Sequence, residues 1–280
     1  MSTIKFSKMH GLGNDFVIID VINQDFTPDV EKIKKWSNRH TGIGFDHILI
    51  VEKPVDSACD FRYRMFNANG EEVKQGGNAA RCFFRFVRDK KLTDKNKITV
   101  ETARGIIALQ MSDDGLITVN MGKPSFEPAD IPFIPDSEAD KERLTHIIVA
   151  GTLSIPLVCV NVGNPHAVVI VEDAEEAPVL QWGSKISSHQ QFPERTNVGF
   201  MQILSKNHIR LRVFERSVGE TLACGTGACA AVAAGIRLGL LEDEVLVSQA
   251  GGDLNIQWHG GQEIFMTGPA ENVFEGTIEN

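Results

Sequence analysis

Two glycine-rich stretches stand just before segments of helical composition, and both could bind an anion. The first is Gly76-Gly77-Asn78 and the second is Cys224-Gly225-Thr226. A helix that begins in such a loop offers unpaired backbone N–H groups and the positive end of its dipole, which suit a carboxylate or a phosphate. Neither stretch matches the phosphate-binding pattern G-x-x-x-x-G-K-[ST], and Gly11-Leu12-Gly13 lacks a third glycine at the dinucleotide spacing. We therefore expect a small carboxylate ligand rather than a nucleotide.

Cys224 is the candidate for proton chemistry, because it stands at the start of the second helix. The helix dipole and the first amides lower a thiol pKa, so Cys224 is predicted to act as a base or a nucleophile. The alternative is a small buried hydrophobic residue, which is the interpretation for the other cysteines, Cys59, Cys82, Cys159 and Cys229. A four-residue gap between Cys224 and Cys229 is poor zinc spacing, and no lysine motif for pyridoxal phosphate is evident. We expect no metal and no cofactor.

Three polar residues near these stretches are open to two interpretations. His166, in Asn164-Pro165-His166, fits a histidine satisfied at a turn or a group that tunes a neighbouring thiol. Glu215 and Arg216 follow an alternating strand and precede a turn, which is typical of a solvated ion pair. Their position beside the second glycine-rich stretch makes a role in the site the alternative.

The segments that carry these residues occur twice along the chain. Gly13-Asn14 and the apolar run after it match Gly163-Asn164 at an offset of 150 residues. Residues 43–49 match residues 198–204 at an offset of 155, and residues 66–79 match residues 214–227 at an offset of 148. One long repeat seen twice predicts two homologous domains, residues 1–122 with 270–280 and residues 123–269.

Each half combines short β-rich runs with one helix. Runs such as residues 98–100 and 209–214, separated by turn residues, favour antiparallel strands. Helices are predicted over residues 79–92 and 227–241, and Val232, Ile236 and Leu240 give the second a buried face. The predicted fold class is α/β (α+β): two pseudo-symmetric domains from an internal duplication, each a curled, mainly antiparallel sheet around a central helix.

Composition excludes several classes of protein. The chain has 280 residues, with 28 Lys+Arg and 37 Asp+Glu, a net charge of −9. Such a balance argues against nucleic acid and anionic membranes as partners. No stretch reaches the roughly 18 apolar residues of a membrane span, and the first residues lack the apolar core of a signal peptide. Five cysteines at low density do not suggest a disulfide framework, so we expect a cytoplasmic protein.

Four segments together are similar to one known family. They are residues 9–16 (MHGLGNDF), residues 163–166 (GNPH), Asn197 within residues 195–199 (RTNVG), and residues 219–229 (GETLACGTGAC). The chain resembles diaminopimelate epimerases from Lys8 to Gly276. The resemblance implies a pyridoxal-independent isomerase of lysine and peptidoglycan precursor biosynthesis, usually a homodimer. It would interconvert LL- and meso-diaminopimelate with two cysteines on two pseudo-symmetric halves.

The resemblance also implies roles for individual residues. Cys224 would be one catalytic acid/base, and Gly76 holds the position of the second catalytic cysteine. His166 and Glu215 would tune thiol pKa values. The residues that would bind the substrate are Asn14, His47, Asn67, Gly77, Asn78, Asn164, Asn197, Glu215, Arg216, Gly225 and Thr226.

The chain departs from the family pattern near the site. Gly76 carries no thiol, His47 stands where glutamine is usual, and Ala79 and Ser217 stand where glycine is usual. Inversion at Cα needs a proton removed on one face and returned on the other, so we expect impaired inversion while exchange on one face persists. We also expect the Ala79 methyl to shift the loop if that position requires a positive φ.

Two other functions remain open. The first is a catalytically inactive paralogue that binds diaminopimelate or pairs with an intact homologue. The second is an isomerase of this two-domain fold acting on proline or hydroxyproline, which the full set of asparagines disfavours.

Overall fold

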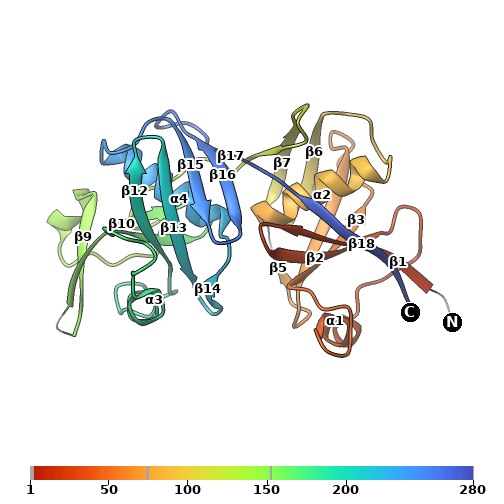
Figure 1. Cartoon of the computed structure of the whole chain (residues 1–280), viewed down its shortest axis with the longest axis horizontal. Helices are drawn as coiled ribbons and strands as arrows, with labels where there is room; N and C mark the ends of the chain where they lie inside the picture. The colour runs from red at the N-terminus through yellow and green to blue at the C-terminus, as the bar shows by residue number, and fades with distance from the viewer. Residues whose placement is uncertain (1–2, 74–75, 152, 280) are drawn as a thin grey trace. The chain divides into compact units, whose positions relative to one another are not determined.

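The computed structural model describes residues 3–73, 76–151 and 153–279. The chain divides into two compact units (Figure 1). Unit 1 is Met1–Asn120 with Thr267–Asn280, and unit 2 is Met121–Met266. Within the described part of the chain, no helix is both long and apolar enough to cross a membrane.

Unit 1 is a mainly antiparallel sheet with two helices. The helices are α1 (Val30–Ser37) and α2 (Gly77–Asp89). The strands are β1 (Thr3–Gly11), β2 (Asn14–Asp20), β3 (His47–Glu52), β4 (Phe61–Asn67), β5 (Glu72–Val73), β6 (Lys97–Thr102), β7 (Gly105–Met111), β8 (Ile117–Asn120) and β18 (Glu271–Glu279). Strand β1 pairs antiparallel with both β2 and β18. The pairs β2–β3 and β4–β6 are parallel.

Helix α2 lies against strands β1, β2, β3, β7, β8 and β18, and ten of its residues are buried. The predicted helix is confirmed, but it ends earlier than expected. Lys91 takes a φ of +56°, a left-handed conformation that cannot continue a right-handed helix. The Leu92 amide then bonds back to the carbonyl of Val87.

Unit 2 is built in a similar way. Its helices are α3 (Val179–Ser187) and α4 (Gly225–Arg237), with a 3₁₀ turn η1 (Glu138–Glu142). Its strands are β9 (Thr145–Ala150), β10 (Leu153–Asn161), β11 (Pro165–Ile170), β12 (Asn197–Ser205), β13 (His208–Glu215), β14 (Gly219–Thr221), β15 (Glu244–Gln249) and β16 (Gly252–Gln257), and β17 (Phe265–Gly268) contains the boundary with unit 1. The pairs β11–β12 and β13–β15 are parallel.

Helix α4 is buried on nearly every side, as predicted, because a run of small residues lets strands approach it closely. Val232 is fully buried, but Leu240 lies beyond the helix and is 40% exposed, so its predicted place on the buried face is wrong. The helix stops before Gly239, whose φ of +72° lies in the left-handed region that glycine adopts without a steric penalty.

The two units repeat one order of strand pairing. In unit 1, Phe16 pairs with His47 in a parallel ladder and His47 pairs with Asn67 in an antiparallel one. In unit 2, His166 pairs with Asn197. The antiparallel ladder of β12 with β13 begins at Val198 and Phe214, and extending its register by one residue sets Asn197 opposite Glu215. Matching these pairs between the two units gives an offset of 150 residues for β2 and β3 and of 148 residues for β4. The predicted match of residues 43–49 with 198–204 is wrong, because Gly44 precedes β3 whereas Gly199 lies inside β12.

Candidate active site

Cys224 is the N-cap residue of α4. It has extended backbone angles, φ −127° and ψ 106°, and its carbonyl accepts the first helical bond from Ala228 at 2.9 Å. Its own amide donates to Gln249 Oε1, at the end of β15, at 2.8 Å. The side chain is 4% exposed. The backbone of Cys224 is therefore tied to the end of β15, which fixes the thiol at the helix start.

The surroundings of the thiol keep it protonated. The Sγ atom lies 3.6 Å from Thr226 Oγ1, and the Glu215 side chain hydrogen-bonds the thiol. Thr221 Oγ1 in turn donates to Glu215 Oε1 at 2.7 Å. Burial, followed by the nearby Glu215 charge, raises the pKa of Cys224 well above its usual value. The predicted lowering of this pKa by the helix dipole is therefore wrong, because loss of hydration outweighs the dipole.

His166 lies on β11 and joins this cluster through Thr226. Its Nε2 atom is 3.0 Å from Thr226 Oγ1 and 3.1 Å from Asn164 Oδ1, and Asn197 Nδ2 lies 3.4 Å away. Complete burial, with a smaller effect of Arg216, lowers the pKa of His166 to about 3. The imidazole is neutral at physiological pH, and any influence on the Cys224 thiol passes through the shared Thr226 hydroxyl.

Arg216 completes the cluster of unit 2. Its backbone N–H donates to Asn197 Oδ1 at 2.9 Å, and its guanidinium Nη1 donates to the Glu194 carbonyl at 3.1 Å. The structure thus brings the predicted site residues of unit 2 together around the start of α4. They are Asn164, His166, Asn197, Glu215, Arg216, Cys224, Gly225 and Thr226.

Two of the predicted residues of unit 1, Asn14 and Asn78, meet at the start of α2. Asn78 Nδ2 is 3.5 Å from Asn14 Oδ1, and Asn14 Nδ2 donates to Asp46 Oδ2 at 2.9 Å. Arg81, which is fully buried, donates to Asn78 Oδ1 at 2.9 Å. Asn14 and Asn78 are therefore fixed by side chains that are themselves bonded.

His47 stands opposite Asn67 in the β3–β4 ladder. Its ring stacks on Phe16, with centroids 5.6 Å apart and planes at 23°. Burial lowers the pKa of His47 below its usual value, although the nearby Asp46 and Asp15 charges and a hydrogen bond with Asn67 act in the opposite direction. The imidazole is thus neutral near pH 7.

Gly76 is the N-cap residue of α2, with φ −149° and ψ 133°, angles that any residue adopts. A Cβ atom there would lie 3.4 Å from Met65 Cε and 3.6 Å from Ala79 Cβ. In unit 2 the corresponding pair is Cys224 and Gly227, where a Cβ on Gly227 would stand 3.3 Å from Cys224 Sγ. At the start of α4 the Cys224 thiol thus faces Gly227, whereas at the start of α2 Gly76 faces the methyl group of Ala79.

The expected backbone shift at Ala79 is not seen. Ala79 lies inside α2 with helical angles, so its methyl group requires no positive φ. Its effect is to fill space beside position 76 instead.

Two residues that hold the site were missed by sequence reasoning. Gln249 accepts the Cys224 amide, and Arg81 anchors Asn78 and also donates to the Pro269 carbonyl at 3.0 Å. A signal for Arg81 was its place between Ala80 and Cys82, in the apolar stretch of α2 that precedes the charged residues of its second half. Gln249 ends an alternating strand, and nothing in the linear order places it beside Cys224.

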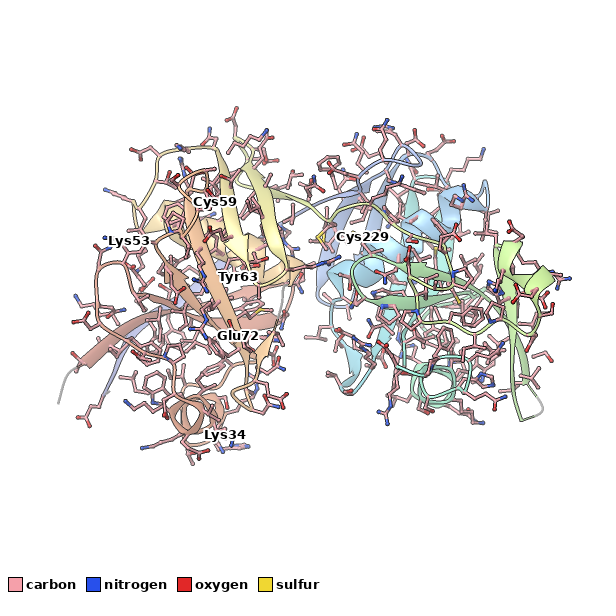
Figure 2. The ribbon with its side chains drawn as sticks, turned by 180° about the vertical axis from the view of Figure 1, so that it is seen from behind. Lys34, Lys53, Cys59, Tyr63, Glu72 and Cys229 are labelled. Carbon is pink, nitrogen blue, oxygen red and sulfur yellow. The ribbon has the colours of Figure 1, made fainter. Side chains whose placement is uncertain are left out.

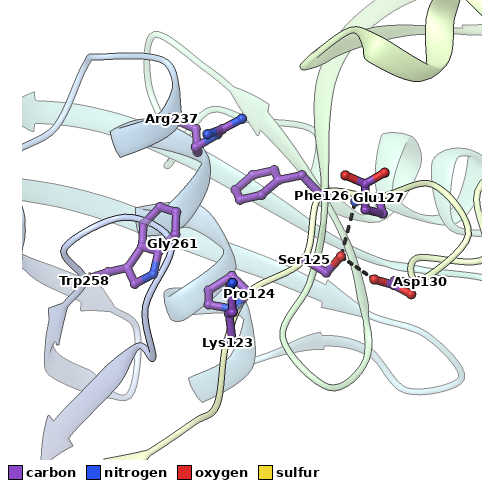
Figure 3. Close-up of a pocket in the computed structure, with 9 residues that line it drawn as sticks. All are labelled: Lys123, Pro124, Ser125, Phe126, Glu127, Asp130, Arg237, Trp258 and Gly261. Atoms are coloured by element: carbon purple, nitrogen blue, oxygen red, sulfur yellow. Dashed lines mark hydrogen bonds between the residues drawn. The ribbon is translucent and has the colours of Figure 1, made fainter.

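A cavity of about 530 Å³ in unit 2 lies away from the Cys224 cluster (Figure 3). Its lining residues are Lys123, Pro124, Ser125, Phe126, Glu127, Asp130, Arg237, Trp258 and Gly261. Arg237 ends α4, whereas Cys224 precedes it. At about 1.5 Å per residue, these ends are roughly 20 Å apart. None of the predicted site residues lines this cavity.

Asp56, Cys59 and Glu101 in unit 1 bring potential metal-ligand atoms within 4.8 Å of one another. Figure 2 labels Cys59 before β4, and it also labels Tyr63 on that strand. Glu101 accepts the Val55 amide at 2.8 Å, and Asp56 accepts the Ala58 amide at 2.9 Å. Burial and the adjacent carboxylates raise the pKa of Cys59. Both acids are thus bonded to backbone, and the expectation of no metal stays a prediction.

Comparison with known sequences identifies relatives over the whole chain. A family model described as "Diaminopimelate epimerase" matches residues 6–127 and 158–273. A diaminopimelate epimerase from Neisseria meningitidis serogroup A is 57% identical over 280 residues, which is 99% of each chain. One from Nitrosomonas europaea is 57% identical over 277 residues, again 99% of each chain.

Solved structures share the fold at much lower identity. A hydroxyproline epimerase from Agrobacterium vitis has a TM-score of 0.71 at 13% identity and covers 99% of this chain and 92% of its own. A phenazine biosynthesis protein from Bacillus anthracis has a TM-score of 0.70 at 18% identity, with full coverage of both chains. These structures establish a mixed α/β fold with mainly antiparallel strands, whereas the full-length identities establish the family. The chain belongs to the diaminopimelate epimerase family of amino-acid isomerases.

Proposed function

We propose that this chain interconverts LL- and meso-diaminopimelate by proton transfer at Cα, with Cys224 as the acid/base on one face. The observation that carries the proposal is the placement of the Cys224 thiol at the start of α4, bonded to Glu215 and 3.6 Å from the Thr226 hydroxyl. A protonated thiol at that point is ready to give a proton to a carbanion.

The protons gained and lost at Cα can be accounted for by side chains alone, without a cofactor. In one direction Cys224 gives its S–H proton to Cα and becomes a thiolate, while a base on the other face takes the original Cα proton. In the reverse direction the Cys224 thiolate takes the proton. The N–H groups at the start of α4 stabilise negative charge on the substrate carboxylate while the carbanion exists.

The substrate carries two amino-acid ends, and the predicted residues supply groups for both. Gly77, Asn78, Gly225 and Thr226 are assigned to the carboxylate and ammonium of the reacting end. Amide and charged side chains are assigned to the recognition of both ends: Asn14, His47, Asn67, Asn164, Asn197, Glu215 and Arg216. What supports this assignment is that Gly77, Asn78, Gly225 and Thr226 lie in the first turns of α2 and α4. In unit 2, Asn197 and Glu215 also belong to the hydrogen-bonded cluster around Cys224.

In this proposal, the glycine at position 76 lowers the rate of inversion at Cα compared with an enzyme that has a cysteine there. It has no acid or base, and a positioned proton donor or acceptor contributes about 10²- to 10⁴-fold. We therefore propose slow inversion together with slow Cα hydrogen exchange on the face served by Cys224, because only the small thiolate fraction left by its raised pKa can take the Cα proton there. A catalytically inactive paralogue that binds diaminopimelate is the alternative, and it predicts binding without exchange.

The test is proton NMR of LL- and of meso-diaminopimelate, each in deuterated water. The proposal expects loss of the Cα proton signal from one of the two stereoisomers, slow inversion, and loss of both in Cys224→Ala. If the unmodified protein binds diaminopimelate but shows no exchange, the epimerase proposal is refuted and the catalytically inactive paralogue remains. An ordinary inversion rate of about 1 to 10³ s⁻¹ would remove the claim of impairment.

The organisation into epimerase-like halves, residues 1–122 with 270–280 and residues 123–269, is also proposed to derive from duplication. The recurring pairing registers of β2–β3–β4 and β11–β12–β13 support it. A homodimer in the cytoplasm is part of the same proposal. Val273 and Phe274 on β18 are 54% and 46% exposed, which supports burial against a second copy. Sedimentation velocity tests the dimer.

A further inference from the structure

Two carboxamides of unit 1 meet where β2 and α2 begin. Asn14 is the first residue of β2, and Asn78 lies in the first turn of α2. Asn78 Nδ2 is 3.5 Å from Asn14 Oδ1, which is long for a hydrogen bond. A carboxamide offers an acceptor oxygen on one side and two donor hydrogens on the other. What this pair offers to a ligand therefore depends on the direction in which each carboxamide is turned.

Asp46 determines how the Asn14 carboxamide is turned. Asp46 directly precedes β3, and its Oδ2 atom accepts hydrogen bonds from Asn14 Nδ2 at 2.9 Å and from the Asp15 backbone N–H at 3.2 Å. A carboxylate has only acceptors, so the reverse orientation of Asn14 would set two oxygen atoms against each other. Asn14 thus directs its NH₂ group at Asp46 and its oxygen at Asn78.

Asp46 is itself fixed by charged neighbours. Its Oδ1 atom accepts from Arg39 Nη2 at 2.7 Å, and its backbone N–H donates to Asp15 Oδ1 at 2.8 Å. Arg39 also donates to both Asp15 oxygens at 2.8 Å, and Lys8 Nζ donates to Asp15 Oδ2 at 2.6 Å. The Asp46 side chain is 41% exposed, and an ion pair at such a site contributes little to stability. The main consequence of the Asp46 carboxylate is therefore the orientation of Asn14.

Arg81 turns the second carboxamide in the opposite sense. Its Nη2 atom donates to Asn78 Oδ1 at 2.9 Å, and a guanidinium has only donors, so Asn78 directs its NH₂ group away from Arg81. Arg81 is fully buried, and its Nε atom donates to the Pro269 carbonyl at 3.0 Å. Gly11 makes room for this contact, because a Cβ atom there would lie 3.2 Å from Arg81 Nη2. The acceptor side of Asn14 thus meets the donor side of Asn78.

An acceptor and a donor side by side suit one end of an α-amino acid. A carboxamide oxygen has two lone pairs and an NH₂ group has two hydrogens, so a single long contact between Asn14 and Asn78 leaves both atoms able to bind a ligand. Asn14 Oδ1 is suited to accept from an ammonium group, and Asn78 Nδ2 is suited to donate to a carboxylate. In an α-amino acid these two groups are attached to the same carbon.

We propose that Asp46 is a positioning residue of the substrate site, which turns Asn14 so that its oxygen receives the substrate ammonium while the Asn78 NH₂ group receives the carboxylate. The proposal rests on the function proposed above, which assigns both asparagines to the substrate. Asp46 acts through Asn14 and makes no contact with the reacting atoms. An acceptor at Asn14 selects for an ammonium group at Cα, and this selection is lost when the Asn14 carboxamide is turned round.

The decisive variant is Asp46→Asn, because it should turn Asn14 round without a change in side-chain size. Arg39 has only donors, and its charged contact at 2.7 Å is stronger than the 3.2 Å contact of the Asp15 N–H. The new carboxamide should therefore direct its oxygen at Arg39 and its NH₂ group at Asn14, which would then direct a donor at the substrate ammonium. We expect the Kd for LL-diaminopimelate, measured by isothermal titration calorimetry, to rise about 10- to 100-fold, which corresponds to one hydrogen bond to a charged group.

A second variant tests the orientation separately from folding. In Asn14→Asp/Asp46→Asn the carboxylate and the carboxamide exchange places, and the net charge is that of the unmodified chain. The new carboxylate accepts from position 46 and keeps an oxygen directed at Asn78, so most of the lost affinity should return. Asn14→Asp alone sets two carboxylates against each other and should bind more weakly than the double variant. The four proteins form a double-mutant cycle, in which the contact between positions 14 and 46 appears as coupling.

Asp60→Asn is the matched control. Asp60 also accepts from a backbone N–H, that of Thr99 at 2.9 Å, and from a cation, Lys95 at 2.6 Å. Because Asp60 is not among the assigned site residues, its replacement should leave the Kd within about twofold of the unmodified value. Thermal unfolding measured on each variant shows whether a change in Kd reflects a loss of folded protein.

An unchanged Kd in Asp46→Asn overturns the proposed role of Asp46. A double variant that binds no better than either single variant overturns it as well, because position 14 would then need its donor rather than its acceptor. In both cases binding, exchange and inversion by the unmodified chain would leave the proposed function in place. An unmodified chain that does not bind LL-diaminopimelate refutes the proposed function itself.

Discussion

Restoring a thiol at position 76 should require two substitutions rather than one. Gly76→Cys is compatible with the backbone, because φ −149° and ψ 133° suit any residue and the new Cβ would make ordinary contacts. The obstacle is the Ala79 methyl group. In unit 2 a carbon at the equivalent position would stand 3.3 Å from Cys224 Sγ, closer than the 3.5–4.0 Å optimum even for two carbon atoms.

The crowded single variant has two ways to respond, and both reduce the gain. If the cysteine side chain introduced at position 76 leaves its preferred rotamer, its thiol no longer points at the substrate Cα. If the start of α2 moves instead, Gly77 and Asn78 are displaced. Overpacking of this kind costs about 1–3 kcal/mol. Gly76→Cys/Ala79→Gly removes the methyl group and should raise the inversion of LL-diaminopimelate at least about 10²-fold over the unmodified chain. Gly76→Cys alone should fall well short of that.

The assay is the initial rate of meso-diaminopimelate formation at saturating LL substrate, with thermal unfolding measured on every variant. Ala79→Gly alone is the control for the helix, and we expect no gain in rate and a loss of up to about 1 kcal/mol of stability. Gly76→Ser/Ala79→Gly is the control for the acid/base group. A single variant as fast as the double would refute the packing argument. A double variant no faster than the unmodified chain would refute position 76 as the place where a thiol acts.

Three further predictions follow from the site and its neighbours. Ser217 takes a φ of +71°, so Ser217→Gly should raise the free energy of unfolding by about 1 kcal/mol, as measured by urea denaturation; no change would mean that local hydrogen bonds already offset the strain. Because burial raises the pKa of Cys224, its alkylation by iodoacetamide should be slow at pH 7 and should accelerate through pH 9, and excess diaminopimelate should protect it; rapid labelling at pH 7, followed by mass spectrometry, contradicts this. The pKa of His166 is about 3 when folded against 6.5 when unfolded, so its contribution to stability is complete above pH 6.5 and is lost as the pH falls toward 3, by up to about 1.4 kcal/mol per pH unit. His166→Gln should flatten the acid slope of the unfolding free energy, and an unchanged slope would point to other groups.

Linear sequence was sufficient for features encoded by neighbouring residues. The glycine-rich starts of α2 and α4 and their apolar spacing predicted both helices, and recognition of family segments predicted the residues that cluster around Cys224. The helix ends were less accurate: Lys91 gave no local signal of a turn after α2, whereas Gly239 was a stop signal after α4 that the predicted range ran past.

Features that depend on tertiary burial were not accessible in the same way. The pKa of Cys224 was predicted in the wrong direction, because neither its 4% exposure nor the approach of Glu215 from β13 is visible in the helix sequence. The offset of residues 43–49 failed for a related reason. A Gly-Phe pair occurs in both halves, but in unit 1 it forms the turn before β3 and in unit 2 it lies inside β12.

The missing side-chain caps at both helix starts link catalysis to folding. Gly76 has no side chain, and no side-chain cap hydrogen bond is present at the start of either helix, whereas a good N-cap contributes about 1 kcal/mol. A bound carboxylate would complete each cap, so part of the stability of α2 and α4 is supplied only when ligand is present. Substrate should then slow amide hydrogen exchange in the first turns of both helices and raise the unfolding temperature with ligand concentration. The same hydrogen bonds then contribute both to substrate affinity and to the stability of the two helices. A variant whose own side chain caps either helix should be more stable but should bind the substrate more weakly.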